Sequence, residues 1–429
     1  MSSPTRRTFL KQTAAASTLA WAGASVSAAG ANERISIAVL GTSRGLTLAR
    51  EFVKHGQRLA YVCDVDSTRA ARAKSDVGAE KSVGDLRRVL DDKSVDAVAI
   101  ATPDHWHAPA TILACEAGKH VYVEKPCAHN IREGRLMIEA ARRTKRVVQV
   151  GTQSRSTKTI QNAMKLLHEG AIGEVLLAKA WNSQRRGNIG HAKPSDPPAG
   201  FDHDLWIGPA PMRPFQSNRQ HYNWHWWYDF GTGDAGNDGV HDLDIALWGL
   251  GVNTHPTSVA GHCSKLYFDD DQQFPDTQNV TFEFAPDKSG RKKQLIYEHR
   301  IWAPYPIAGH DNGNAFYGTK GWMELGKKDG WKLYGPRNKL IDQEQGTFSV
   351  TDHTADFLQA VRSGKRPNAD IEIGHRSAAL AHLANILART GRHSLDFDPH
   401  KERFPTDTQA DAHVSRSYRE NHWAVPKGV

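Results

Sequence analysis

A lysine held next to a proline is the first candidate for chemistry. Glu124, Lys125 and Pro126 follow a short apolar run, residues 121–123. Pro126 has a fixed φ and disfavours helical backbone at the preceding residue, so we expect Lys125 to be extended. Ligands of open α/β sheets bind outside the carboxyl ends of the strands. Lys125 is therefore a candidate for contact with a reacting group, although a solvated Glu-Lys pair at a strand exit would look the same.

A second candidate lies in residues 233–244, which are rich in glycine and acids and lead into an apolar helical pattern. If this segment is helical, His241 and Asp244 are three residues apart and close enough to interact. A histidine oriented by a carboxylate makes a good general base near neutral pH. The open alternative is a capped or solvated histidine at a helix start.

A dense run of aromatic residues and histidines, residues 221–229, precedes that segment. In an extended conformation Tyr222, Trp224, Trp226 and Tyr228 would share one face. Such a face suits the apolar face of a sugar, but aromatic side chains most often pack in cores and interfaces. We expect one or two of the four to line a site and the others to be structural.

A glycine-rich turn predicts a nucleotide site. The apolar run 35–40 is read as a buried strand, and it is followed by the turn 41–45 and a helical pattern. Strand, glycine turn and helix form the context of dinucleotide binding, although Ser43 stands where a glycine is usual. Asp64 ends the next strand at about the spacing, roughly 20 residues, of the acid that binds the adenosine ribose. This acid favours NAD, while NADP stays possible.

A third strand, residues 96–100, is followed by Thr102 and Pro103, and a helix is expected over about 109–117. The loop between them, which includes His107, is expected to line the cofactor. His105 and His107 could instead be a metal pair, but no third ligand lies nearby in the sequence. We therefore predict no metal site.

The elements that position these residues fall into two groups. Strands alternate with helices up to residue 152, which predicts a doubly wound parallel sheet in a Rossmann domain, residues 33–152. Strand-like segments without regular helices between them follow, which predicts an α/β domain with a large, mostly antiparallel open sheet, residues 153–395. Residues 182–220 are polar and rich in proline and glycine, and are expected to form an active-site loop or a subunit-contact arm. Residues 396–429 are read as a C-terminal tail.

Composition excludes several classes of protein. The chain has 429 residues and a formal net charge of +8, and its Lys and Arg residues are spread out, which does not favour nucleic acid as a partner. Its four cysteines contain no Cys-x-x-Cys pair, so a thiolate zinc site is not expected.

The first residues predict export. Residues 5–11, with Arg6 and Arg7, resemble the twin-arginine motif, and a weakly apolar, Ala-rich segment follows. This segment is too short and too polar for a stable membrane span. Residues 1–30 are therefore read as a signal peptide that takes the protein to the periplasm or otherwise out of the cytoplasm, with no membrane contact after cleavage. A disordered basic tail is the alternative.

Taken in order, the glycine turn, Thr102-Pro103 with His107, Glu124-Lys125-Pro126 and the segment 239–244 resemble the Gfo/Idh/MocA family of sugar and cyclitol oxidoreductases. The resemblance covers roughly residues 33 to 395. It implies a Rossmann domain, a second domain whose sheet commonly forms dimer or tetramer interfaces, and a small carbohydrate as substrate.

The resemblance also implies roles for residues. Lys125 would hydrogen-bond the reacting oxygen and the nicotinamide ribose, and His241 would take the hydroxyl proton. Asn237 is a departure, because many members carry an acid there. The residues expected at the cofactor are Gly41, Thr42, Ser43, Arg44, Gly45, Asp64, Thr102, Pro103, His107, Glu124 and Lys125, and those expected at the substrate are Asn237, Asp238, Tyr222, Trp224 and Tyr317.

Export and NAD chemistry together shape the expected reaction. Little soluble NAD is found outside the cytoplasm, so a cofactor loaded before export and retained through the cycle is expected. One alternative is an NAD-dependent, redox-neutral glycosidase that resembles the α-N-acetylgalactosaminidases of the family. Another is a sugar- or nucleotide-binding protein that has lost catalysis.

Overall fold

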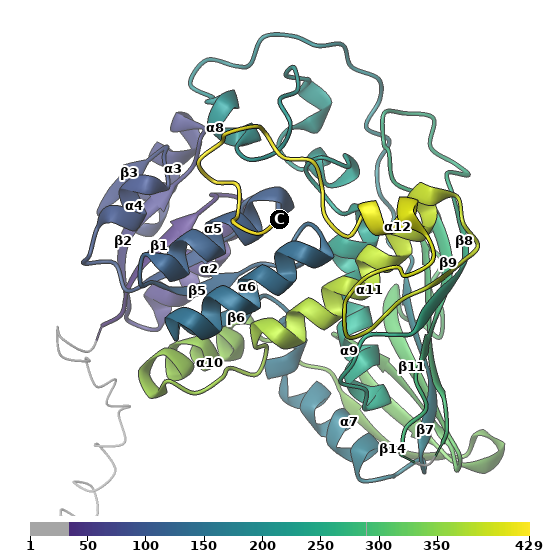
Figure 1. Ribbon diagram of the computed structural model, residues 1–429. Coiled ribbons are helices and arrows are strands. Elements are labelled where there is room, and N and C mark those ends of the chain that lie inside the picture. Colours follow the sequence, from purple (N-terminus) through teal and green to yellow (C-terminus); the bar gives the residue numbers. More distant parts are fainter. Residues whose placement is uncertain (1–33, 289) are drawn as a thin grey trace, which may run out of the picture. The chain divides into compact units, whose positions relative to one another are not determined.

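In the computed structural model, which describes residues 34–288 and 290–429, the first sheet contains six parallel strands in the order β3-β2-β1-β4-β5-β6 (Figure 1). The predicted signal peptide lies outside the described residues. The central strands are apolar and buried because helices cover both faces of a doubly wound sheet. The strands are β1 Ser36–Leu40, β2 Arg58–Cys63, β3 Lys81–Val83, β4 Ala97–Ile100, β5 His120–Val123 and β6 Val148–Val150.

Helices connect these strands, and short polar side chains cap several of them. Asp66 accepts hydrogen bonds from two first-turn N–H groups of α3, and Asn130 accepts one from Glu133 N of α6. Of the apolar residues of α2 that predicted a helix, Ala49 and Phe52 are buried, whereas Val53 is exposed. The helices are α2 Arg44–Lys54, α3 Ser67–Val77, α4 Arg87–Asp91, α5 Asp104–Glu116 and α6 Ile131–Thr144.

Helix α5 begins earlier than the sequence predicted, so His105 and His107 lie in its first turns and not in a loop. The prediction was wrong because Pro109 was taken as the start of the helix, whereas it lies inside. A proline there leaves the carbonyl of residue 105 without its helical partner. The guanidinium of Arg416 donates a hydrogen bond to that carbonyl at 2.8 Å.

The second sheet contains nine strands among the described residues, in the order β14-β13-β12-β11-β7-β10-β9-β8-β15. Its pairs are antiparallel except β7 with β10, which confirms the predicted class of fold. Strands β13, β14 and β15 were not predicted. The strands are β7 Val175–Asn182, β8 Ser258–Ser264, β9 Thr277–Phe284, β10 Lys293–Arg300, β11 Asn312–Gly318, β12 Trp322–Gly326, β13 Gly330–Tyr334, β14 Leu340–Gln345 and β15 Ser394–Asp396.

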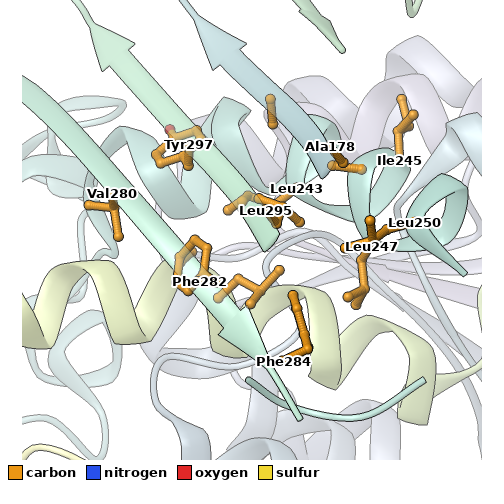
Figure 2. Close-up of a cluster of buried hydrophobic side chains, with 14 of the residues drawn as sticks. Ala178, Leu243, Ile245, Leu247, Leu250, Val280, Phe282, Phe284, Leu295 and Tyr297 are labelled. Carbon is orange, nitrogen blue, oxygen red and sulfur yellow. The ribbon is translucent and has the colours of Figure 1, made fainter. Parts of the chain in front are cut away.

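Helices pack on one face of this sheet (Figure 1). Figure 2 shows the apolar face of α9, including Leu243 and Leu247, against strand residues such as Phe282 and Leu295. Burial of these side chains fixes the helix that carries His241. The remaining helices are α7 Lys158–His168, α8 His203–Ile207, α9 Val240–Leu250, α10 Val350–Ser363, α11 Ile371–Thr390 and α12 Thr408–Ala412.

Two later segments run back to the first sheet's domain. The region 182–220 contains α8 and contacts the start of α3, where Ser67 N donates to Gly200 O at 2.9 Å and Asp202 N donates to Val65 O at 2.9 Å. In the predicted tail, Arg416 and Tyr418 both bond Glu133 of α6. None of the helices described here is both long and apolar enough to cross a bilayer.

Candidate active site

The carboxyl ends of the first sheet's strands and the start of α9 face one cavity of about 560 Å³. This is where open α/β sheets bind their ligands. Most of the sequence-predicted site residues line it, namely Gly41, Thr42, Ser43, Arg44, Asp64, Thr102, Pro103, His107, Glu124, Lys125, Tyr222, Trp224, Asn237, Asp238 and His241. Gly45 and Tyr317 are not among its lining residues.

The glycine turn after β1 needs its glycines for two different reasons. Gly41 has φ +86°, and a Cβ there would lie 2.4 Å from the carbonyl oxygen of Ala101. Gly45 packs against β1, since a Cβ there would lie 2.7 Å from a methyl carbon of Val39. Of the two roles expected for Gly45, the structure therefore shows close packing between helix and strand.

The carboxylate of Asp64 fits the expected ribose contact. It accepts hydrogen bonds from Thr42 N at 2.9 Å, from the Thr42 hydroxyl, and from Asp66 N at 3.0 Å. A carboxylate has about four acceptor sites, so one is left for a ligand hydroxyl. Asp64 thus shapes the glycine turn and keeps an acceptor at the cavity, as a dinucleotide requires.

Lys125 is held by the residue that departs from the family pattern. Its ammonium donates to the backbone oxygen of Asn237 at 2.7 Å and to Oδ1 of Asn237 at 2.9 Å. The amide nitrogen of Asn237 faces the other way and donates to the Tyr222 hydroxyl at 3.0 Å and to Asp234 at 3.3 Å. An amide has both an acceptor for the lysine and a donor for Asp234, whose partner is Arg186.

The predicted pairing of His241 with Asp244 is wrong. Arg155 takes Asp244 through Nε at 2.9 Å and Nη2 at 2.9 Å, and Ser377 bonds it as well. Within the described part of the chain, His241 makes no side-chain hydrogen bond, and its imidazole lines the cavity. Burial, with the cations Lys327 and Lys125, holds the pKa of His241 well below its usual value. His241 is therefore a neutral acceptor near neutral pH.

Asp238 has charged neighbours that the sequence did not reveal. Its carboxylate pairs with Arg186, which also binds Asp234. Burial raises the pKa of Asp238, but Lys327, Lys125 and Arg186 outweigh it, and the pKa lies well below its usual range. Lys327 lies in the turn between β12 and β13, and Arg186 in the long polar region. Neither has a local sequence signal, because each reaches the site only through the fold.

The aromatic segment is not extended as expected. Residues Asn223–Trp226 form a turn of 3-10 helix, so alternate residues do not share a face. Tyr222 and Trp224 line the cavity, whereas Trp226 is 2% exposed and Tyr228 packs on Phe274 with ring centroids 4.5 Å apart. Two of the four aromatic residues therefore line the cavity and two are structural, as expected. His225 of the same turn also lines the cavity.

The rings of His105 and His107 contact backbone carbonyl oxygens. The ring nitrogens of His107 lie 2.7 Å from Pro126 O and 2.9 Å from Thr102 O, and Nε2 of His105 lies 2.9 Å from Trp206 O. His107 thus joins the loop after β4 to the Lys125–Pro126 segment.

Tyr317 lies away from the cavity, on β11. Its ring stacks on that of Trp322, with centroids 6.1 Å apart, and it is 41% exposed. Its neighbour Phe316 packs under α9, so the alternation of the strand turns Tyr317 to the opposite face of the sheet.

Comparison with known proteins agrees with this architecture. A family model described as an oxidoreductase family with an NAD-binding Rossmann fold matches residues 35–152. The model of the C-terminal alpha/beta domain of that family matches residues 158–287 and 339–425. Together they cover most of the chain.

Three curated relatives have names in carbohydrate chemistry. The scyllo-inositol 2-dehydrogenase (NAD(+)) of Bacillus subtilis is 28% identical over 78% of this chain and 88% of its own length. A levoglucosan dehydrogenase of Pseudarthrobacter phenanthrenivorans is 38% identical, but over 27% of this chain and 30% of its own length. A glycosyl hydrolase family 109 protein of Saccharopolyspora erythraea is 32% identical over 34% of each chain.

Among solved structures, a levoglucosan dehydrogenase in complex with NADH has a TM-score of 0.66 at 19% identity, and covers 85% of this chain and 99% of that one. This likeness shows a common fold. The two family matches, together with the Rossmann sheet, the glycine turn and the second sheet, show that the chain belongs to the Gfo/Idh/MocA family of oxidoreductases, whose first domain is an NAD-binding Rossmann fold.

Proposed function

We propose that this protein is an NAD-dependent oxidoreductase that oxidises a carbinol carbon of a sugar, glycoside or cyclitol. The observation that carries the proposal is the meeting of Lys125 and His241 in the cavity that also holds the glycine turn and Asp64. The names of the inositol and levoglucosan dehydrogenases support the substrate class.

The side chains divide the work of the reaction. NAD, when bound, supplies the acceptor for a hydride from the carbinol carbon. Asn237 takes two of the three N–H donors of Lys125, so the third would donate to the reacting oxygen, and the charge of the ammonium would favour the alkoxide-like transition state. His241 is neutral and takes the hydroxyl proton. Asp64 holds the adenosine ribose.

We propose further that the cofactor is retained between turnovers. Phe201 and Trp206 of the long region and Trp423 of the C-terminal segment line the same cavity as Asp64. The long region is bonded to the residues after β2, and the guanidinium of Arg87 lies 4.6 Å from the Trp423 ring. These segments, called here the cofactor strap (residues 198–206 and 419–425), would have to separate from the Rossmann domain to release a dinucleotide.

Retention fits the proposed export through the twin-arginine pathway, since a protein folded around NAD needs no external supply. The net reaction is then redox-neutral, or couples two sugar substrates. Transient oxidation within glycoside cleavage is the second candidate, and the relative named as a glycosyl hydrolase family 109 protein favours it. Lys125 and His241 serve either scheme.

We also propose a homodimer or homotetramer formed through the second sheet. The stacked rings of Tyr317, Trp322 and Tyr334 lie on a sheet whose other face carries the helices. An open face with exposed aromatic rings is a common interface surface. Light scattering on Tyr317→Glu beside the native protein tests this, with a lower mass expected for the variant.

The first experiment is to denature the purified mature protein and assay the supernatant for nicotinamide nucleotides. Near-stoichiometric NAD(H) supports retention, and the loaded protein is then screened with polyols and chromogenic glycosides. Release of aglycone without net NADH selects the glycosidase. Reversible binding of added NAD by an empty protein leaves an ordinary dehydrogenase, whereas no binding of NAD or NADP overturns the catalytic proposal in favour of a non-catalytic binding protein.

A further inference from the structure

The hydroxyl oxygen of Tyr222 accepts a hydrogen bond, and its proton has no acceptor in the part of the chain that the structure describes. Asn237 Nδ2 approaches it at 3.0 Å, and an amide NH₂ can only donate, so the tyrosine oxygen accepts. Asn237 cannot reverse its amide without turning its NH₂ toward the Lys125 ammonium. The Tyr222 proton is therefore directed to another acceptor, and Tyr222 lines the cavity.

His225 has the opposite arrangement. Its Nδ1 bonds the carbonyl oxygen of Tyr222. A carbonyl only accepts, so Nδ1 carries the proton and Nε2 carries a lone pair. The residue is 8% exposed, it lines the cavity, and Nε2 has no hydrogen-bond partner among residues 34–288 and 290–429.

The surroundings fix the ring and keep it uncharged. The ring stacks on Trp224 with centroids 3.6 Å apart, and the backbone of His225 packs against Gly231, where a Cβ would lie 2.5 Å from the Cα of His225. Burial, with the nearby Lys125 ammonium, lowers the pKa of His225 to about 3. The rings of Tyr222 and His225 are 4.5 Å apart.

We propose that Tyr222 and His225 form a donor–acceptor pair that recognises one hydroxyl group of the substrate next to the reacting carbon. The Tyr222 proton is donated to that oxygen, and the hydroxyl proton is donated to Nε2 of His225. A ketone, ether or deoxy carbon at this position lacks a donor and leaves Nε2 buried and unpaired. The site thus selects a vicinal diol, with one hydroxyl at Lys125 and His241 and its neighbour at the pair. This inference rests on the proposed function.

Two substitutions at one position separate the acceptor from the fold. His225→Asn keeps a donor near the place of Nδ1 and loses the acceptor at Nε2, whereas His225→Gln can return an acceptor there. The substrates are scyllo-inositol, levoglucosan and methyl glucosides, each with its monodeoxy and mono-O-methyl derivatives. For the parent polyol, kcat/KM should fall about 10- to 100-fold in His225→Asn, mostly through KM, and should recover in part in His225→Gln.

The decisive comparison is between substrates. Removal of one particular hydroxyl group from the substrate should lower the kcat/KM of the native protein by a similar factor. This loss should disappear in His225→Asn and become smaller in Tyr222→Phe. Tyr228→Phe, outside the cavity, is the matched control for the second variant. Equal losses for every deoxy derivative in native and variant proteins overturn the inference and leave the oxidoreductase intact. No turnover of any polyol by the loaded native protein overturns the proposed function and this inference with it.

Discussion

At the scale of single residues, the site is defined by what holds Lys125 and His241. Asn237 orients the lysine through two hydrogen bonds, and its amide NH₂ donates hydrogen bonds to Tyr222 and Asp234. Arg155 takes Asp244, and no carboxylate in the described part of the chain hydrogen-bonds His241. The histidine therefore depends on its buried surroundings, and the lysine on direct contacts.

Loss of the Lys125 ammonium should abolish most of the activity. Lys125→Met keeps the length of the side chain and removes the donor at the reacting oxygen, so kcat should fall about 10²- to 10³-fold. Steady-state kinetics with any polyol that the native protein oxidises measures this. Lys339→Met, at an exposed position outside the cavity, is the matched control and should match the native enzyme. A variant with native kcat would remove Lys125 from the mechanism.

The pH dependence should reflect the lowered pKa of His241. The ordinary histidine pKa is about 6.5, and burial with Lys327 and Lys125 shifts this group downward, so the neutral base persists below that pH. Protonation of His241 should therefore not lower the kcat/KM of the native protein as the pH falls from 8 to 6. A histidine titration near pH 6.5, seen by ¹⁵N NMR and absent in His241→Asn, would contradict this expectation.

At the scale of elements, a buried carboxylate joins helices to the C-terminal segment. Glu402 accepts hydrogen bonds from His255 at 2.9 Å, from His375 of α11 at 2.8 Å, and from Arg135 of α6. Gly134 of α6 lies beside them, and a Cβ there would be 2.2 Å from His375 Nδ1. The guanidinium already balances the carboxylate, so this cluster is a structural connection between elements.

Glu402→Gln should destabilise the protein by about 3 kcal/mol, the scale for breaking a buried pair. Burial raises the pKa of Glu402, but its donors outweigh this, and the pKa lies well below its usual range. The stability from Glu402 is therefore present above the unfolded pKa and is lost as pH falls through the folded one.

The difference in Tm between native and Glu402→Gln proteins should be largest at pH 6 to 8 and should shrink below about pH 4, near the ordinary carboxyl range. Thermal melts across this range measure it. Glu372→Gln, a more exposed partner of Arg376 on α11, should change Tm little, because surface pairs contribute about 0–1 kcal/mol. Equal effects of the two substitutions would mean that Glu402 has no special role.

At the scale of the whole molecule, segments far apart in sequence close the cavity. The cofactor strap comes from the second domain's long region and from the C-terminal segment, yet both contact the Rossmann domain. The proposed retention of NAD would thus depend on the tertiary structure.

Opening the strap should therefore speed the loss of cofactor. Trp423→Ala removes a ring that lines the cavity but is 37% exposed, so the fold should tolerate it. Nucleotide content after exhaustive dialysis should fall to a minor fraction, while kcat with saturating NAD stays near native. Tyr305→Ala, whose ring is 74% exposed, is the control. Full retention of nucleotide in Trp423→Ala would show that this half of the strap does not hold the cofactor.

The sequence by itself determined what depends on neighbours along the chain. Buried runs predicted the parallel strands, Gly41 predicted the turn, and the proline after Lys125 predicted an extended lysine at a strand end. The fold class and the family followed from these local rules and from the order of the motifs.

Only the tertiary structure decided which side chains pair. Arg155 takes Asp244 from 89 positions away, and Asn237 reaches Lys125 across 112. The aromatic segment forms a turn, so its faces could not be read from an alternating pattern, and Tyr317 points to the far side of its sheet. Local periodicity encodes the burial of an element's face, but a partner is chosen by the packing of distant elements, and no short stretch of sequence carries that information.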